Sequence, residues 1–516
     1  MLGSVTAPER VRLADLLAGL SVATDLGLGV PPETAVRITL VAQAIAGELG
    51  LDAATRTDLY YATLLRSVGC TGFAHELVGW FGDEFSAVRA VADVDMTRPR
   101  EALGAVAASV RGAGRGHRTR ALLATTVKGP QVDRYITRAD CEGMAAFVRR
   151  FAVGAGVGPV LQQVFERWDG KGGPRGLAGE AIDVAARVMV LADQAVPFHR
   201  TGGVAAAAEM ARRRSGGWFD PACVEAFLRC ADDVLAVVGA GGAWEAALAA
   251  EPEPWVTVPP WGVDDVAGAF ADFADLKSPY LLGHSPGVAE LAAGAAERLD
   301  LDTADRTTLR LAALLHDLGR VAVSSRLWDK PGPLSPPEWE QVRLHAYYTE
   351  RVLRGSPLLE PLAAVAGAHH ERCDGSGYHR GLASVPATAR VLAAADVFHA
   401  LTEPRPHRAA LGVDQAGAVV EAAARAGSLD PDAVGAVCAV AGAPIRPVAR
   451  EWPDGLTDRE VQVLRLLARG RSKKEIAAEL VIAPGTVHTH VTHVYQKTGV
   501  STRAGIALYA LEHQLL

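Results

Sequence analysis

Two short stretches of the chain place histidine next to aspartate or next to a second histidine. Residues 314–320 read LLHDLGR, and residues 369–378 read HHERCDGSGY. Imidazole nitrogen and carboxylate oxygen are ligands that divalent first-row metals accept. With the histidines and aspartate that precede, separate and follow these stretches, the candidate metal ligands are His284, His316, Asp317, His345, His369, His370 and Asp396.

This set is large enough for two metal ions. Two ions about 3.5–4 Å apart can clamp a phosphodiester and hold a nucleophile between them. Neighbouring residues of a helix point about 100° apart, so an adjacent pair such as His316 and Asp317 suits a wide centre. Each member would serve a different ion, or Asp317 would bridge both. The alternative is a set of hydrogen-bonded core histidines without a metal.

The elements that must position these residues are predicted to be helices. Apolar residues recur at helical spacing, for example at Val288, Leu291, Ala292 and Ala295. Strand-like alternation is nearly absent, and Ala and Leu are abundant. The pattern predicts an all-α fold made of helical bundles.

The chain contains an internal repeat. Residues 40–70 align with 290–320 without a gap, at an offset of 250 residues. Further on, residues 166–177 match 371–382, and the stretch ending at Asp193 matches the one ending at Asp396. Because the order is the same in both halves, we predict a tandem duplication.

The first copy lacks the ligand set. Arg66 and Ser67 stand in place of His316 and Asp317, Thr34 in place of His284, and Val164 and Phe165 in place of His369 and His370; only Asp193 remains. We therefore predict a metal-free first copy. It has about 45 extra residues within 80–130, where the basic, glycine-rich run 111–120 is interpreted as a solvated loop, with phosphate contact as the alternative.

Residues 272–408 resemble the HD-GYP family of the HD phosphohydrolase superfamily. The matching text is KSPYLLGHS from Lys277, HDLGR from His316, WDKPGPL from Trp328, Glu338-Trp339 with His345, HHE through Gly377-Tyr378, and DVFHAL with RPHR up to Arg408. The resemblance implies the seven ligands named above, an iron- or manganese-type binuclear centre, and hydrolysis of cyclic di-GMP. It further implies catalytic roles for Asp317 and Arg320. The substrate contacts that it implies come from Arg320, Asp374, Gly377, Tyr378, Arg405 and Arg408.

Several positions depart from the family pattern. Arg320 replaces the lysine of HDxGK, His379 replaces the proline of GYP, and His407 replaces the tyrosine of RPYR. Tyr280 stands where some members have a glutamate for a third metal, so two ions are expected. Because the ligands are kept while substrate-facing residues vary, substrate identity is less determined than metal binding.

The last 63 residues, 454–516, follow a different pattern. Thr457 to Glu460 and Ser472 to Glu475 are capping boxes, and Pro484 suits the first turn of a third helix. The pattern alone is equally consistent with a protein-binding tail of four helices. The text beginning Leu456-Thr457-Asp458-Arg459-Glu460 resembles the LuxR-type helix-turn-helix over its full length. That resemblance implies dimeric binding to double-stranded DNA. The expected DNA-binding residues are Lys473, Lys474, Thr486, His488, Thr489, His490, Thr492, His493 and Lys497.

Composition and linkers divide the chain. It has 516 residues, a net charge of -7, and 49% hydrophobic and 22% charged residues, which fits a folded chain without an overall polycationic character. Six scattered cysteines without a CxxC motif, and no signal-peptide or membrane-spanning pattern, predict a cytoplasmic protein. We predict a degenerate repeat at 1–240, a linker at 241–262, a phosphohydrolase domain at 263–443, a second linker at 444–453, and the DNA-binding domain at 454–516.

The expected protein is a transcriptional regulator with a metal-dependent phosphodiesterase domain. Its predicted partners are double-stranded DNA, a cyclic dinucleotide and a second copy of itself. The alternative is a sensor that binds metal and nucleotide without useful turnover and gates a LuxR-type transcription factor.

Overall fold

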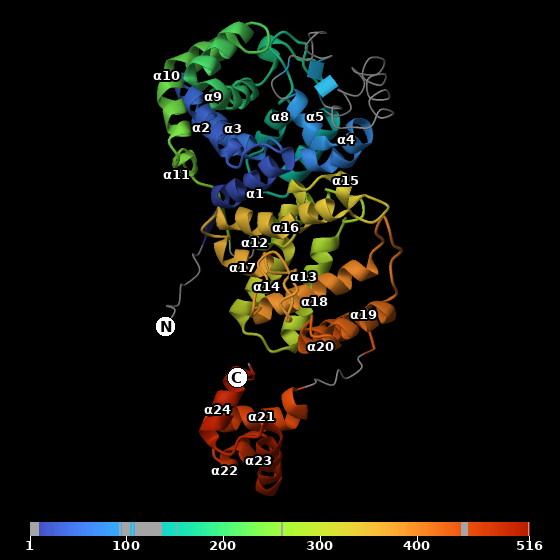
Figure 1. Ribbon diagram of the computed structural model, residues 1–516. Coiled ribbons are helices and arrows are strands. Elements are labelled where there is room, and N and C mark those ends of the chain that lie inside the picture. The colour runs from blue at the N-terminus through green and yellow to red at the C-terminus, as the bar shows by residue number, and fades with distance from the viewer. Residues whose placement is uncertain are drawn as a thin grey trace.

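The computed structural model describes residues 10–91, 137–151, 153–259, 262–444, 452–513 and 515, with a few isolated positions between 94 and 108. The basic run 111–120 and most of the predicted linker 444–453 lie outside the described residues. Figure 1 shows two helical bundles, one above the other, and a small helical domain at the C-terminus.

The first bundle is built around the helix pair α2 and α3, on which the later helices pack. Its labelled helices are α1 (Leu13–Leu28), α2 (Thr34–Glu48), α3 (Ala53–Leu65), η1 (Cys70–Phe73), α4 (Ala74–Phe81), α5 (Glu84–Val91), α8 (Val157–Leu161), η2 (Gly179–Ala181), α9 (Val184–Arg214), α10 (Pro221–Gly239) and α11 (Ala243–Ala249). Residues 137–148 are helical as well.

The second bundle is built around α13 and α14, which pack against each other. Its helices are α12 (Val263–Asp275), α13 (His284–Arg298), α14 (Thr303–Leu315), η4 (Leu318–Ala322), α15 (Ser325–Trp328), α16 (Pro336–Arg354), α17 (Glu360–Ala366), α18 (Ala387–Thr402), α19 (Val413–Arg425) and α20 (Pro431–Ala441).

The two bundles repeat the same helix pairings. Helix α2 packs on α3, α9 and α10, and α13 packs on α14, α18 and α20. The loop hydrogen bonds also correspond: Glu166 accepts from the backbone amides of Arg175 and Leu177, and Glu371 accepts from those of Arg380 and Leu382. These parallels support the prediction of a duplication.

The bundles share one continuous apolar core. Helix α1 packs on η4 and α16 of the second bundle (Figure 1). A buried ion pair joins them as well: Lys277 Nζ lies 2.9 Å from Glu84 Oε1, and both side chains are almost fully shielded from solvent. The first bundle is therefore packed against the domain that carries the candidate ligands.

The segment predicted as the first linker is packed on the first bundle. It contains α11 and the strand β2 (Thr257–Val258), which pairs antiparallel with β1 (Val11–Arg12). Glu251 accepts a hydrogen bond from the Tyr61 hydroxyl, and Tyr60 donates to the Ala247 carbonyl. Residues 243–258 thus complete the first bundle, because the strand pairing and these hydrogen bonds join them to it.

The C-terminal domain consists of η5 (Pro453–Gly455), α21 (Asp458–Ala468), α22 (Lys473–Glu479), α23 (Pro484–Thr498) and α24 (Arg503–Glu512), with its own apolar core. The capping boxes at Thr457 and Ser472 are present as predicted, and Pro484 is the first residue of α23. Gly470, just beyond α21, has a φ of +84°, in the left-handed region that glycine tolerates best. The helix starts predicted from Thr457, Ser472 and Pro484 are therefore confirmed.

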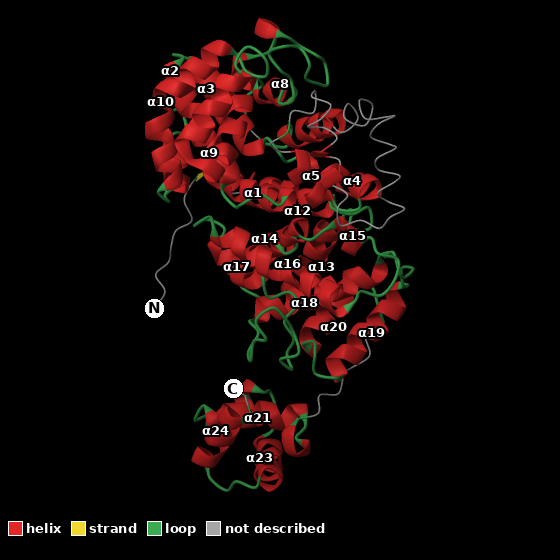
Figure 2. Cartoon of the chain, turned by 45° about the horizontal axis from the view of Figure 1, so that its top comes forward, coloured by secondary structure: helices red, strands yellow, loops and turns green. Residues whose placement is uncertain are grey.

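The predicted all-α class is confirmed. Among the described residues, the only strands are the short pair β1 and β2, and Figure 2 shows helices almost throughout. The six cysteines are free thiols, as expected. Within the described part of the chain, no helix is long and apolar enough to cross a membrane.

Candidate metal centre

The His316-Asp317 pair lies where α14 ends. His316 is the C-terminal cap of α14, and Asp317 precedes the short helix η4. The chain turns here against α16: a Cβ atom on Gly319 would lie 2.0 Å from the His345 carbonyl oxygen. The Thr349 hydroxyl on α16 donates to the His316 carbonyl and accepts from the Gly319 amide. The glycine of the HDLGR motif therefore lets two ligand-bearing helices approach closely.

Asp317 lies between two groups of imidazoles. Its Oδ2 atom is 3.0 Å from His316 Nε2 and 3.4 Å from His284 Nε2. Its Oδ1 atom is 3.6 Å from both His345 Nε2 and His369 Nε2. The two oxygens of this fully buried carboxylate thus face different groups, as a bridging carboxylate would.

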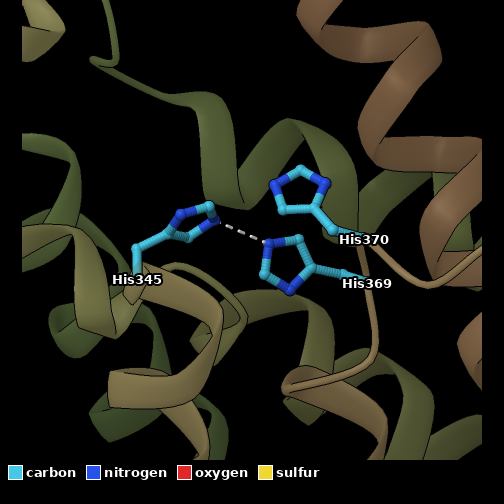
Figure 3. A group of neighbouring side chains, drawn as sticks. All are labelled: His345, His369 and His370. Carbon is cyan, nitrogen blue, oxygen red and sulfur yellow. Dashed lines mark hydrogen bonds between the residues drawn. The ribbon is translucent and has the colours of Figure 1, made fainter. Parts of the chain in front are cut away.

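Each group has the composition of a metal site. The ligand atoms of His284, His316 and Asp396 lie within 4.8 Å of one another, and those of His345, His369 and His370 do so as well. Figure 3 shows the three rings of the second group converging, with His345 Nε2 3.1 Å from His369 Nε2. The structure therefore brings together all seven residues that the sequence analysis predicted as metal ligands.

The histidine rings are oriented by hydrogen bonds on their outer nitrogens. The Nδ1 atoms of His316, His345 and His369 lie 2.6–2.7 Å from the carbonyl oxygens of Ala313, Val342 and Ala366. If Nδ1 carries the proton in each of these bonds, Nε2 is left as the lone-pair donor toward the centre.

Burial and neighbouring charge shift the histidine pKa values in opposite directions. Burial lowers the pKa of His345 to about 4 and that of His369 to about 3, and it holds the pKa of His370 well below its usual range. Burial also acts on His316, but the adjacent Asp317 carboxylate outweighs it and raises the pKa to about 10. Neutral imidazole is the form that binds metal, so these three candidate ligands have the required form at neutral pH.

The donor set fits divalent first-row metals. His316 Nε2 and both Asp317 carboxylate oxygens are buried and make no hydrogen bond of ordinary geometry with the described residues. Burying such groups without well-formed hydrogen bonds is costly, and coordination would satisfy them. Neutral imidazoles together with carboxylates are the ligands that these ions accept.

Arg320 contributes a cationic side chain to the same centre. Its Nη2 atom lies 2.7 Å from Asp317 Oδ2, and its guanidinium group lies over the Trp328 ring. The side chain is buried, and its Nε and Nη1 atoms have no hydrogen-bond partner among the described residues. Two unused donors beside the ligands are suited to an anionic group such as a phosphate.

The loop after His370 packs closely around the site. A Cβ atom on Gly377 would lie 2.4 Å from the Arg372 amide nitrogen, so this position has no room for a side chain. The Tyr378 ring lies 4.7 Å from the His370 ring. Glu371 accepts the backbone amides of Arg380 and Leu382 in this loop. Asp374 is exposed and accepts hydrogen bonds from Ser376.

The two arginines of the RPHR stretch have different environments. Arg405 donates to the Tyr280 carbonyl and to Glu403, beside His284. Arg408 donates to the carbonyls of Ala400 and Leu401 at the end of α18. Arg405 therefore lies near the ligands, whereas the guanidinium of Arg408 is used to cap a helix.

The corresponding place in the first bundle holds an ion pair. Arg66 Nη1 lies 2.6 Å from Asp193 Oδ1, so an arginine provides the positive charge beside the aspartate that matches Asp396. Arg66 terminates α3 as His316 terminates α14.

Sequence reasoning missed Glu403 and Glu350. Glu403 Oε2 lies 2.8 Å from His284 Nδ1, and its spacing from Asp396, i to i+7 on one helix, could have identified it. Glu350 Oε2 lies 2.9 Å from Nε2 of His379, the residue that stands at the family's proline position, and Glu350 also forms an ion pair with Arg380. No sequence signal indicated this partner.

In the C-terminal domain, most of the predicted DNA-binding side chains are exposed, and His490 is half-buried. Lys473 Nζ lies 2.8 Å from His488 Nδ1 at the start of the two helices. Lys497 is bound within the domain, to the Gly455 carbonyl and to Glu460. The exposed face of α23 therefore carries hydroxyl and imidazole groups together with the amide of Gln496.

Comparisons with known proteins agree with this geometry. Residues 268–433 match the family model described as HD domain, and residues 454–510 match that of bacterial regulatory proteins of the luxR family. The 3'3'-cGAMP-specific phosphodiesterase 3 of Vibrio cholerae is 31% identical over 423 residues, which cover 79% of this chain and 90% of that protein. The chain belongs to the HD-GYP family of HD-domain phosphodiesterases.

Further comparisons place the HD-GYP domain among cyclic-dinucleotide enzymes. A cyclic di-GMP phosphodiesterase of Thermotoga maritima is 35% identical over 148 residues, 28% of this chain and 39% of that protein. The crystal structure of a cyclic GMP-AMP specific phosphodiesterase from V. cholerae has a TM-score of 0.58 and 27% identity, and the match covers 85% of this chain and 99% of that one. The resemblance predicted from the motifs is thereby confirmed, and the family is one of metal-dependent phosphohydrolases.

Proposed function

We propose that the second bundle of this HD-GYP protein hydrolyses a phosphodiester bond of a cyclic dinucleotide, with two divalent metal ions that are iron or manganese. The observation that carries this proposal is the placement of Asp317 between two groups of imidazoles. The names of the relatives support cyclic di-GMP and 3'3'-cGAMP as the substrates to test.

The proposed ligands divide between the two ions. His284, His316 and Asp396 would hold one ion, and His345, His369 and His370 would hold the other, with Asp317 shared between them. Bound ions of this kind would polarise the phosphoryl oxygens and make a water molecule more acidic. Arg320 would hold a phosphate oxygen through Nε and Nη1, because Nη2 already contacts Asp317. We propose further substrate contacts from Asp374, Gly377, Tyr378, Arg405 and Arg408.

The test is turnover by the purified full-length chain. Cyclic di-GMP and 3'3'-cGAMP are each incubated with the chain and added Mn²⁺ or Fe²⁺, and the products are separated by chromatography. We expect a linear dinucleotide or mononucleotides from the wild type and none from the Asp317→Ala variant. No product under any of these conditions would refute the enzymatic proposal.

A second candidate function is nucleotide sensing without useful turnover. It is favoured by the contact between Arg320 and Asp317. An arginine paired with the Asp317 carboxylate competes with the metal ions for that carboxylate and would thereby reduce turnover. Tight nucleotide binding without product would support this sensor. A change in DNA affinity on adding nucleotide would then measure the coupling between the domains.

We propose that the C-terminal domain binds double-stranded DNA as a homodimer and that the protein acts in the cytoplasm. Helix α23 would enter the major groove with the seven predicted residues that it carries, Thr486 to Lys497, and the amino-terminal end of α22 would contact phosphate through the other two, Lys473 and Lys474. The match of residues 454–510 to the luxR family supports this proposal. Gel-shift titration with a selected DNA site, together with the mass of the complex in solution, tests both DNA binding and dimerisation.

We propose that the first bundle is a degenerate, metal-free copy within 1–240, followed by domains at 263–443 and 454–516 as predicted. The Arg66–Asp193 ion pair supports the absence of a metal in that copy. Metal analysis of the purified chain tests it, since about two ions per chain are expected and about four would contradict the proposal.

A further inference from the structure

The His284 ring differs from the other inward-facing rings in what holds its outer nitrogen. His316, His345 and His369 each use a backbone carbonyl three residues earlier in the chain. His284 is the first residue of α13, and the carbonyl three residues before it, that of Leu281, already accepts the His284 backbone amide. The Nδ1 atom of this ring has a side-chain partner instead.

That partner is Glu403. Its Oε2 atom lies 2.8 Å from His284 Nδ1, while His284 Nε2 lies 3.2 Å from Asp396 Oδ1 and 3.4 Å from Asp317 Oδ2. Glu403 caps α18, the helix that also carries Asp396. Helix α18 therefore supplies both the candidate ligand Asp396 and the Glu403 carboxylate, which contacts the candidate ligand His284.

Glu403 is itself held by cationic and imidazole groups. Arg405 Nη2 lies 2.8 Å from Glu403 Oε2, and His399 Nδ1 lies 3.4 Å from Oε1. The ligand atoms of His284, His399 and Glu403 lie within 4.8 Å of one another, which by itself would suit a further metal ion. The Arg405 guanidinium, 3.5 Å from His284 Nδ1, places positive charge in that space and argues against such an ion.

We propose that Glu403 is a positioning residue of the metal centre: it accepts the Nδ1–H of His284 and thereby presents the Nε2 lone pair to the ion held with His316 and Asp396. This inference rests on the proposed metal centre. Partners of this kind fix the tautomer and the ring orientation of a ligating histidine, and their loss weakens metal affinity about 10–100-fold.

Metal affinity provides the first test. Full-length wild type, Glu403→Ala, Glu403→Gln and Glu403→Asp are loaded with Mn²⁺ and titrated with a chelator. We expect Glu403→Ala to weaken the binding of one ion about 10–100-fold and to leave the other unchanged. Glu403→Asp withdraws the carboxylate and should behave like alanine, whereas the amide oxygen of Glu403→Gln can still accept the hydrogen bond and should largely restore affinity. If alanine fails to fold, the aspartate and glutamine pair decides the question.

Glu421→Ala serves as a matched control, because it removes another buried glutamate of the same domain, on α19. Its metal affinity should equal that of the wild type. Binding of both ions by Glu403→Ala within about two-fold of the wild type would overturn the proposal. Equal losses in the alanine and glutamine variants would also overturn it, because charge toward Arg405 would then matter rather than the acceptor.

The metal-free protein gives an independent readout. Nitrogen-15 NMR of labelled histidine rings should report a His284 ring protonated at Nδ1 and bonded through it in the wild type and in Glu403→Gln. In Glu403→Ala this signal should be lost. An unchanged signal would refute the role of Glu403. If the wild type takes up no metal, the proposed centre fails, and the NMR result still decides separately whether Glu403 orients the ring.

Discussion

Replacing Asp317 by alanine is the most informative single change in this protein. The carboxylate contacts Arg320 at 2.7 Å and His316 at 3.0 Å through one oxygen, and it faces His345 and His369 at 3.6 Å through the other. Removal would leave the arginine without this counter-charge and take from both imidazole groups the carboxylate that we propose they share as a ligand.

The cost to stability follows from burial. At an effective dielectric constant of about 20, two unit charges 2.7 Å apart attract by about 6 kcal/mol. Desolvation offsets much of this attraction, but removing one partner of a buried pair still costs about 3–5 kcal/mol. We expect the metal-free Asp317→Ala variant to lose about this much unfolding free energy. Its turnover should fall at least about 10³-fold, the upper range for losing one group that stabilises a transition state.

Three measurements check this prediction: urea denaturation of the metal-free chain, metal content after loading, and cyclic-dinucleotide turnover. Asp305→Ala is the matched control, because Asp305 is an exposed carboxylate in the first turn of the same helix, α14. It should change stability by less than about 0.5 kcal/mol. An Asp317→Ala protein that binds two ions and turns over like the wild type would show that Asp317 is no shared ligand and would refute the reasoning.

Three further predictions concern other parts of the chain. Burial raises the pKa of Asp25 to about 7. The stability that its protonated form contributes is therefore complete below pH about 4 and is lost as the pH rises through about 7. Relative to Asp25→Asn, the wild type should lose about 2–3 kcal/mol of unfolding free energy between pH 5 and pH 8, and parallel pH profiles of the two proteins would contradict this. Lys277→Met leaves the buried Glu84 carboxylate without its counter-charge and should lower the unfolding free energy, measured by denaturation, by about 3–5 kcal/mol. The double variant Lys277→Met/Glu84→Leu should recover part of this free energy, and no recovery would refute the pairing. Lys473→Ala should weaken binding to all DNA sequences equally, and it should reduce the steepness of log affinity against log salt concentration by about 1. Fluorescence anisotropy measures both, and an unchanged slope would show that Lys473 contacts no phosphate.

The candidate ligands and the helix-turn-helix could be identified from sequence because both depend on local spacing. Histidine and aspartate at the ends of apolar helical runs indicated the centre, and capping residues such as Ser472 indicated where helices begin. The partners that hold these groups were not predictable in the same way. Glu350 and His379 are 29 residues apart, and only the packing of the loop against α16 brings them together.

The order of helices, the repeat and the identity of the candidate ligands were therefore determined by the sequence itself, because side-chain chemistry and helical periodicity are properties of neighbouring residues. Tertiary structure decided which atoms face one another. It placed the two Asp317 oxygens toward different imidazole groups, joined Glu403 to His284 and packed Lys277 against Glu84 of the first bundle. These contacts arise when helices far apart in the chain bury their apolar faces together, and that packing is a property of the whole fold.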